Sequence, residues 1–320
     1  MYKIFVTRKI SQRGIELLKA KGYAVQIGSQ TRNLSQKEIM QKGKGVDVLL
    51  CMLTDKIDGK VMDAMGLQLK IIANYAVGVD NIEFKAAKRR NIIVTNTPDV
   101  VTEAVAEHTV ALILGIARGL VQADRFVRQG KYKGWEPELF LGTELQGKIL
   151  GIVGCGRIGL EVAKKMFVAF GMQVRYYDNA PREEAEKTCG AVPVSLNELL
   201  QKSDVVSLHV PLVQATHHLI GEKELKMMKK TAYLINTSRG SVIDEKVLVR
   251  ALKQKWIAGA ALDVFENEPK LAAGLSKLDN ALLTPHIASA TKETREKMSE
   301  LAAQNIIAVL SGQTPSNLVI

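Results

Sequence analysis

The sequence predicts an α/β protein with two parallel sheets, each covered by helices on both faces. Short apolar segments alternate with amphipathic helical segments over the first hundred residues, and the same alternation returns between residues 149 and 284. A long helical stretch separates the two runs. A chain of 320 residues is also long for one domain and comfortable for two.

The first run begins with a strand and ends with one, which is the pattern of repeated strand–helix units. The expected strands are Lys3–Thr7, Tyr23–Ile27, Val46–Met52, Leu69–Asn74 and Ile92–Asn96. The expected helices are Ser11–Lys21, Ser35–Lys42, Asp58–Met65 and Ile82–Arg90. Ser35 with Glu38 three residues later marks a capping box at the start of one helix.

The region between the two runs reads as one helical stretch from Thr102 to about Lys131, because Pro98 interrupts the earlier alternation. Gly115 and Gly119 are positions where this helix can bend. The strands expected after it are Ile149–Val153, Val174–Asp178, Ala191–Val194, Val205–His209, Ala232–Asn236, Gly259–Val264 and Ala281–Thr284. A final helix is expected at Thr291–Leu310.

The composition is that of a globular protein of the cytoplasm. Hydrophobic residues make up 47% of the chain and charged residues 24%, and no apolar run reaches the roughly 18 residues of a membrane helix. No signal peptide is expected, and the three cysteines lack disulfide or metal spacing. The net charge of +11 is spread over helix faces and aromatic residues are only 5%, so we expect no nucleic acid partner.

The glycine motif between Val153 and Leu160 is typical of dinucleotide binding. Gly154, Gly156 and Gly159 form G-x-G-x-x-G between a predicted strand and a predicted helix. They permit a tight turn, a close approach to a pyrophosphate and close helix packing. Asp178, at the end of the next strand, is placed to accept from ribose hydroxyls, which favours NAD over NADP. A purely structural turn is the alternative, and nearby Arg182 could reach a 2′-phosphate.

Three charged side chains follow C-terminal strand ends of the second run, where ligands bind in open α/β sheets. Arg239 could hold a substrate carboxylate by two parallel hydrogen bonds. His286 could donate a proton to a carbonyl oxygen while hydride reaches the carbon, and Glu268 in contact with it would favour the imidazolium. Strand-end charges are also often solvated or act as caps. His217 and His218 are adjacent and are expected to point in different directions, so no metal site is predicted.

The chain resembles the D-isomer-specific 2-hydroxyacid dehydrogenase family over nearly its whole length. The motifs that carry this resemblance occur in order: NYAVGVDNI (74–82), AEHTVALIL (106–114), GTELQGKILGIVGCGRIG (142–159), HVPL (209–212), INTSRG (235–240), ALDVFENEP (261–269) and TPHIASAT (284–291). The resemblance implies a Rossmann cofactor domain, residues 101–286, inserted into a flavodoxin-like substrate-binding domain, residues 1–100 and 287–320. The substrate cleft would lie between them, and a homodimer would form on the cofactor domain.

The resemblance also implies roles for individual residues. It makes Arg239, Glu268 and His286 the catalytic set, with Val77 and Gly78 as backbone donors to the substrate carboxylate. The expected cofactor contacts, in addition to the three glycines, are Thr109, Arg157, Ile158, Asp178, His209, Pro211, Thr216, Thr237, Ser238, Arg239, Asp263, His286 and Ser289.

The substrate expected from the resemblance is a small anionic 2-oxo acid, which the enzyme would reduce to the D-2-hydroxy acid. Stretches 51–58 and 96–109 and Trp135 favour glyoxylate and hydroxypyruvate reductases. A D-3-phosphoglycerate dehydrogenase without a regulatory domain is the alternative, because GTELQGK is shared with that group. A non-catalytic NAD-sensing protein like the family's corepressors is the alternative of another class. Glu268 argues against formate dehydrogenases, which carry glutamine there.

Overall fold

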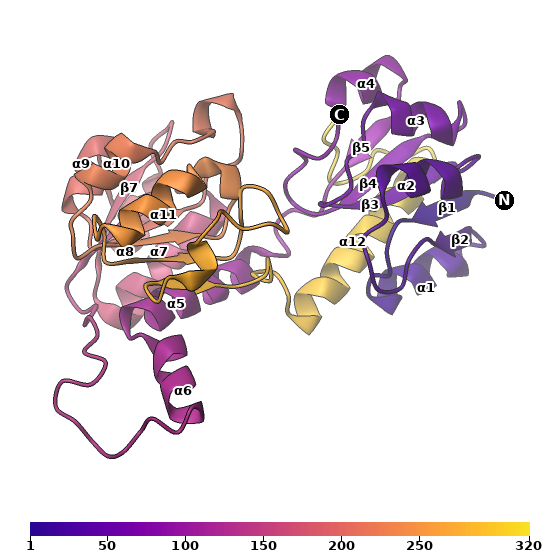
Figure 1. Ribbon diagram of the computed structural model, residues 1–320. Helices are drawn as coiled ribbons and strands as arrows, with labels where there is room; N and C mark the ends of the chain where they lie inside the picture. The colour runs from indigo at the N-terminus through magenta and orange to yellow at the C-terminus, as the bar shows by residue number, and fades with distance from the viewer. The chain divides into compact units, whose positions relative to one another are not determined.

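The computed structural model describes residues Met1–Ile320 and divides them into two compact units (Figure 1). The first unit comprises Met1–Val101 and Ser289–Ile320, and the second comprises Thr102–Ala288. The chain therefore leaves the first unit, forms the whole second unit and returns. The predicted boundaries at 100/101 and 286/287 differ from these by one and two residues.

The first unit is built on a five-stranded parallel sheet of order β2-β1-β3-β4-β5. Its strands are β1 (Lys3–Val6), β2 (Ala24–Ile27), β3 (Val48–Met52), β4 (Ile71–Tyr75) and β5 (Ile93–Thr95). Its helices are α1 (Gln12–Ala20), α2 (Gln36–Lys42), α3 (Gly59–Met65), α4 (Phe84–Arg89) and α12 (Lys292–Leu310). This strand order is that of flavodoxin-like sheets, as the family resemblance implies.

Buried apolar residues explain why these segments pair. Residues 48–51 and 71–75 are entirely buried, which suits central parallel strands covered on both faces. The capping box predicted at Ser35 is present, with the Ser35 side chain accepting from the Glu38 N–H. Helix α12 lies against α1, where the Gly14 N–H donates to Ser299 Oγ at 2.7 Å.

The second unit contains a seven-stranded parallel sheet of order β12-β11-β10-β9-β6-β7-β8. Its strands are β6 (Ile149–Val153), β7 (Gln173–Tyr177), β8 (Val192–Pro193), β9 (Val205–Leu208), β10 (Tyr233–Asn236), β11 (Gly259–Leu262) and β12 (Ala281–Leu283). Its α-helices are α5 (Thr102–Ala117), α6 (Leu120–Arg128), α7 (Arg157–Phe170), α8 (Glu183–Cys189), α9 (Leu196–Lys202), α10 (Glu222–Met227) and α11 (Glu245–Lys253), and its 3₁₀ turns are η1 (Gln214–Thr216), η2 (Gly240–Val242) and η3 (Leu275–Lys277). The order of the strands reverses between β6 and β9, which is the switch point of a doubly wound sheet.

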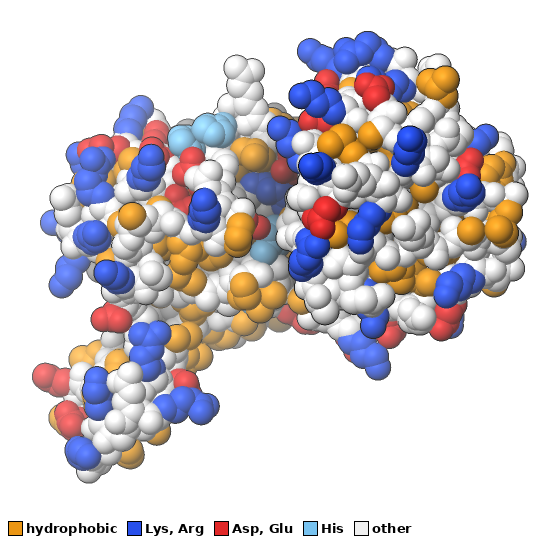
Figure 2. Space-filling view, turned by 45° about the vertical axis from the view of Figure 1, so that its right-hand side comes forward, with side chains coloured by type: hydrophobic (Ala, Val, Ile, Leu, Met, Phe, Trp, Pro, Cys, Tyr) orange, Lys and Arg blue, Asp and Glu red, His pale blue; other side chains and the backbone are white.

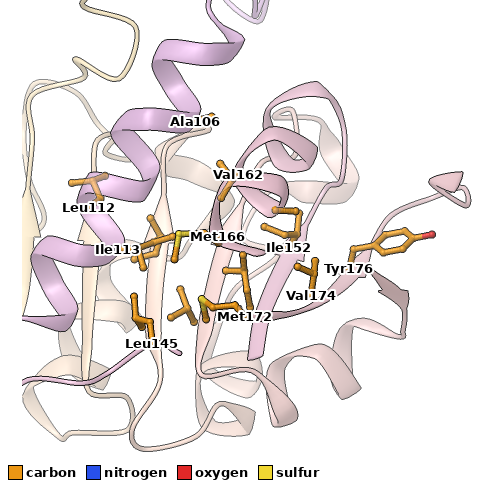
Figure 3. Packing of buried hydrophobic residues seen from close by; sticks show 14 of the residues in the cluster. Ala106, Leu112, Ile113, Leu145, Ile152, Val162, Met166, Met172, Val174 and Tyr176 are labelled. Carbon is orange, nitrogen blue, oxygen red and sulfur yellow. The ribbon is translucent and has the colours of Figure 1, made fainter. Parts of the chain in front are cut away.

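The core on one face of this sheet joins α5 and α7 to β6 and β7 (Figure 3). Ile113 of α5 and Met166 of α7 are fully buried, and Ile152 of β6 belongs to the same cluster. This packing holds α7 over β6, so the glycine motif between them has a fixed position.

The stretch 102–131 is two helices and not the single one that the sequence predicts. Gly119, with φ +59, breaks it, and α5 and α6 meet at a bend of 64°. Helix α6 and the loop after it project from the rest of the second unit (Figure 1). No single helix of the chain is long and apolar enough to span a membrane. Only the bent pair α5 and α6 reaches that length and composition when taken together, and most of the apolar residues of α5 lie in the core.

Candidate active site

The glycine motif forms the turn between β6 and α7 at the switch point of the sheet. Gly154 has φ +89, and a Cβ there would lie 2.8 Å from a methyl group of Val210. A Cβ on Gly159 would lie 2.3 Å from the Gly154 carbonyl oxygen. Both positions therefore exclude a side chain, as the motif predicts.

Gly156 differs from its two neighbours because a Cβ there would meet no protein atom within 4 Å. Packing therefore does not require glycine at this position, and the space beside it is open to a ligand. Gly156 precedes α7, and no side chain caps this helix. The free N–H groups of the first turn of a helix bind phosphates, so the turn fits a dinucleotide pyrophosphate.

Asp178 follows β7 and is paired with Arg182. Its two oxygens accept from Arg182 Nε at 3.1 Å and Nη2 at 2.9 Å, and Oδ1 also accepts from the Asn179 N–H at 2.7 Å. Burial alone would raise the pKa of Asp178, but the bonds from Arg182 and Asn179 outweigh it and hold the pKa below its usual value. The carboxylate is therefore ionised at neutral pH and shares its charge with a cation.

Arg239 lies in a turn after β10 that Asn236 holds together. The Asn236 amide donates to the Arg239 carbonyl at 2.9 Å and accepts from the Ser238 N–H at 3.0 Å and from Ser238 Oγ at 2.9 Å. Asn236 is fully buried, so its hydrogen bonds to the turn are shielded from water. Arg239 Nη1 donates to the Ser238 carbonyl at 2.9 Å, and the positive charge of Arg239 helps to lower the pKa of Glu268.

Glu268 and His286 are in direct contact, although 18 residues separate them. His286 Nδ1 lies 2.9 Å from Glu268 Oε2 and 3.1 Å from Oε1, and both side chains are about one quarter exposed. Burial alone would raise the pKa of Glu268, but the hydrogen bond and charge of His286, the Phe265 N–H and Arg239 bring it below its ordinary value. The three predicted catalytic residues therefore belong to one cluster at the C-terminal ends of β10, β11 and β12.

Asp263 holds the turn that carries His286. Its carboxylate is fully buried and accepts from Thr284 Oγ1 at 2.7 Å, from the Ile287 N–H at 2.9 Å and from the Ala288 N–H at 2.8 Å. The Asp263 carbonyl accepts from the His286 N–H at 2.8 Å. His286 itself has φ +55, a left-handed conformation that a histidine rarely adopts without such support. His108 Nε2, 3.5 Å from Asp263 Oδ1, completes the group.

The other predicted cofactor contacts lie on α5, at the start of α7, at or after the ends of β9 and β10, and in the segment after β12. Thr109 of α5 meets Thr237, with their hydroxyl oxygens 3.0 Å apart. Thr216 closes the loop after β9, since its hydroxyl donates to the Pro211 carbonyl at 2.6 Å. His209 Nε2 lies 2.9 Å from Ser207 Oγ, and burial lowers the pKa of His209 to about 3, so its imidazole is neutral. Arg157 and Ile158 open α7, and Ser289 begins the return to the first unit.

Val77 and Gly78 belong to the first unit, in the loop after β4. Asn96 Nδ2 donates to the Val77 carbonyl and Asn74 Nδ2 to the Gly78 carbonyl, each at 2.8 Å. Asn81 ties the end of the loop to the Met52 and Asp55 carbonyls, each at 3.1 Å. The loop is thus held through its carbonyl groups.

His217 and His218 do not point in different directions, so that expectation is wrong. Their rings stack with centroids 4.0 Å apart, and His218 Nε2 lies 2.8 Å from Glu266 Oε1. The backbone of His218 has φ +51, and this left-handed conformation turns the second ring alongside the first.

Sequence reasoning missed the supporting roles of Asn236 and Asp263. The role of Asn236 could have been predicted, because an asparagine in a turn commonly forms hydrogen bonds with the backbone two residues later. Asp263 carried none, because a buried aspartate that organises a turn on a neighbouring strand depends on the order of strands in the sheet.

Comparison with known proteins finds a matching family and relatives that align with nearly the whole chain. The family described as "D-isomer specific 2-hydroxyacid dehydrogenase, NAD binding domain" matches residues 110–288. A glyoxylate reductase of Thermococcus litoralis is 49% identical over 99% of this chain and 96% of its own length. A crystal structure from Thermus thermophilus is 43% identical, with a TM-score of 0.93 and coverage of 99% of this chain and 100% of that one.

A second solved structure is informative about the cofactor. It is an NADPH-dependent glyoxylate/hydroxypyruvate reductase from Sinorhizobium meliloti in complex with NADP and malonate, 34% identical, with a TM-score of 0.88 and coverage of 99% of this chain and 96% of that one. Some structures of this fold therefore bind NADP. The family match covers more than half of the chain, and the relative from Thermococcus litoralis aligns with nearly all of it. This protein is therefore an oxidoreductase that belongs to the D-isomer-specific 2-hydroxyacid dehydrogenase family.

Proposed function

We propose that this enzyme reduces glyoxylate, and hydroxypyruvate as a second substrate, to the D-2-hydroxy acid with NADH. The observation that carries the proposal is the contact of His286 with Glu268 beside Arg239, next to a turn that fits a dinucleotide. The glyoxylate reductase from Thermococcus litoralis, at 49% identity, supports the choice of substrate.

In the mechanism that we propose, Arg239 binds the substrate carboxylate by paired hydrogen bonds. A nicotinamide cofactor held at the glycine turn would supply the hydride that the carbonyl carbon accepts. His286 Nδ1 is engaged by Glu268, so the ring donates the balancing proton from Nε2 to the carbonyl oxygen, which becomes the hydroxyl. Glu268, ionised at neutral pH, stabilises the imidazolium that must be present before the transfer.

The proposal is tested with purified enzyme, NADH and a panel of 2-oxo acids. We expect the highest kcat/KM with glyoxylate, with hydroxypyruvate next. His286→Ala should lower kcat by about 10² to 10⁴-fold while NADH binding is retained. Arg239→Ala should raise KM and lower kcat together. Higher kcat/KM with 3-phosphohydroxypyruvate would instead indicate the phosphoglycerate dehydrogenase alternative.

A non-catalytic NAD-sensing protein is the competing function of another class. Binding of NADH without oxidation in the presence of any 2-oxo acid, with NADPH equally inactive, would establish it and refute the enzyme proposal. The direct Glu268–His286 contact favours the enzyme proposal, because binding of a dinucleotide alone does not require a positioned proton donor.

For the cofactor we propose NAD, with NADP less favoured. Asp178 is ionised and stands at the ribose end of the glycine motif, where its charge repels a 2′-phosphate. Arg182 opposes this effect because it is paired with Asp178 and could bind that phosphate. The two side chains set the preference together.

The cofactor proposal makes opposite predictions for the two members of the pair. Asp178→Ala should raise the kcat/KM ratio of NADPH to NADH by about tenfold or more, since it removes the repulsion and releases Arg182. Arg182→Ala should lower the same ratio. If the unmodified enzyme prefers NADPH, the guanidinium outweighs the carboxylate and NAD is the wrong choice.

We propose that the enzyme is a homodimer formed by the cofactor-binding unit. Helix α6 has no buried residue, although Leu120, Val121 and Val127 lie on it. The loop after it exposes Trp135, at 82%, and Leu141, at 76%. Figure 2 shows apolar side chains among charged ones on this projecting arm. Exposed apolar surface of this extent is typical of protein interfaces.

A further inference from the structure

A second cluster of ligating side chains lies in the second unit, formed by His217, His218 and Glu266. Each offers one nitrogen or oxygen, and these atoms all lie within 4.8 Å of one another. The two histidines follow η1 in the loop after β9, and Glu266 follows β11. This cluster has no part in the mechanism proposed above.

The fold brings together the side chains of two adjacent histidines and of a glutamate about fifty residues later in the chain. Adjacent histidines in extended backbone project to opposite sides. Here His218 has a left-handed φ and the rings stack 4.0 Å apart at 29°. One nitrogen of each ring lies within 4.8 Å of a Glu266 carboxylate oxygen. A cation between such donors needs bonds of about 2.0 to 2.2 Å. The 2.8 Å separation of His218 Nε2 and Glu266 Oε1 therefore has to open by roughly half an ångström.

The backbone on both sides of the cluster is held in place. The His218 N–H donates to the Ser241 carbonyl at 2.8 Å. The Glu266 N–H donates to Glu245 Oε2 at 2.7 Å, and the same Glu245 side chain accepts from the Ala272 N–H at 2.7 Å. Glu245 is buried, so it anchors the loop that carries Glu266. Fixed backbone with partly exposed donors allows entry of an ion and limits the entropy lost on binding.

We propose that His217, His218 and Glu266 form a binding site for a divalent transition-metal ion, with Zn²⁺ as the best-matched cation. Two imidazoles and one carboxylate are a donor set that zinc accepts, with a fourth position left to water. Imidazole nitrogen disfavours Mg²⁺ and Ca²⁺, which prefer oxygen. The metal would take the place of the hydrogen bond between His218 and Glu266, which satisfies both side chains in the apo protein.

A bound ion would link the loop after β9 to the loop after β11. Its ligand in the second loop, Glu266, lies two residues before Glu268. Because the folded protein alone presents these donors together, a bound ion stabilises it against unfolding. We therefore expect the midpoint of thermal unfolding to rise by several degrees when Zn²⁺ is present at about 100 times its dissociation constant.

The test is titration of the full-length, untagged protein with Zn²⁺ by calorimetry and with Co²⁺ by visible absorption. The expected result is one ion per chain, with affinity lowered about tenfold or more by His217→Ala and by Glu266→Gln. His217 is exposed, so its removal leaves the folded structure intact, which far-ultraviolet circular dichroism checks.

The catalytic pair is the competing site, because His286 and Glu268 also bring a nitrogen and an oxygen within 2.9 Å. His286→Ala is the matched control and should leave the stoichiometry and affinity unchanged. Loss of binding in His286→Ala with retention in His217→Ala would overturn the proposal, as would the absence of saturable binding in the unmodified protein. The readout is metal binding, so failure here is distinct from failure of the proposed reductase activity.

Discussion

At the scale of single residues, the proposed mechanism depends on the pairing of Glu268 with His286. The pKa of Glu268 lies below its ordinary value, so the carboxylate keeps its charge throughout the neutral range and its own titration falls at acid pH. In the proposed mechanism, reduction consumes a proton that His286 donates, so we expect its rate to fall as pH rises.

Replacing Glu268 with glutamine keeps the size of the side chain and removes its charge. The imidazolium loses a stabilising partner, so a lower pH is needed to populate it. We expect the falling limb of kcat/KM for reduction to move to lower pH, measured with glyoxylate and NADH. The matched control is Glu266→Gln, which changes the neighbouring carboxylate and should leave this limb in place. An unshifted limb in the Glu268 variant would show that the pair is not coupled.

The sequence alone predicts that the three proposed catalytic residues lie near one edge of the sheet, but it does not predict several of their contacts. Arg239, Glu268 and His286 follow strand ends, and parallel strands present those ends on one edge of the sheet. The pairing of Asp178 with Arg182 was foreseen only as proximity. The stacking of His217 on His218 was predicted wrongly, because it depends on one left-handed backbone angle that no residue-type pattern indicates.

At the scale of elements, the turn after β12 is the part of the site that depends most on tertiary structure. It carries His286 with a positive φ, and the buried carboxylate of Asp263 satisfies the N–H groups of Ile287 and Ala288. Burial alone would raise the pKa of Asp263, but the hydrogen bonds from His108, Thr284 and the two N–H groups hold it below the ordinary value. The family resemblance assigns Asp263 to cofactor binding, and these contacts add a positioning role.

Asp263→Asn distinguishes positioning from cofactor contact. The amide NH₂ of the asparagine would face one of the backbone N–H groups that now donate to the carboxylate. A buried donor would be left unsatisfied, which costs about 1 to 3 kcal/mol in stability. We expect kcat to fall much more than NADH affinity, because the turn displaces His286. Asp279→Asn, the same change at an exposed site, is the control and should alter neither quantity. Weaker NADH binding with unchanged kcat would assign Asp263 to the cofactor alone.

The break between α5 and α6 shows where periodicity fails as a guide. The apolar stripe Leu112, Ile116, Leu120 and Ala123 keeps helical spacing across the break, so the pattern predicts one helix. Gly119 adopts φ +59 and bends the chain instead. The stripe then divides: the α5 part lies in the core of the second unit, while α6 buries no residue at all.

At the scale of the whole molecule, alternation alone predicts two parallel sheets, but not how the strands are ordered. The first sheet has the order β2-β1-β3-β4-β5, and the order of the second reverses between β6 and β9. Both depend on crossover connections that the sequence pattern does not determine. They were expected only through the family resemblance. The return of the chain as α12 is likewise invisible to periodicity, because a terminal helix can cover either sheet.

The apolar side of α6 leads to the last prediction, which concerns assembly. Light scattering coupled to size-exclusion chromatography should give the mass of two chains of 35.1 kDa. The double variant Val127→Asp, Trp135→Ser replaces two apolar side chains that are 57% and 82% exposed. Because both are exposed, we expect the chain to fold as before. The double variant should elute as a monomer, because burying an unpaired carboxylate in an interface is costly. Leu67→Asp changes an exposed leucine in the other unit and should remain a dimer. A dimeric double variant, or a monomeric unmodified protein, would contradict an interface on this arm.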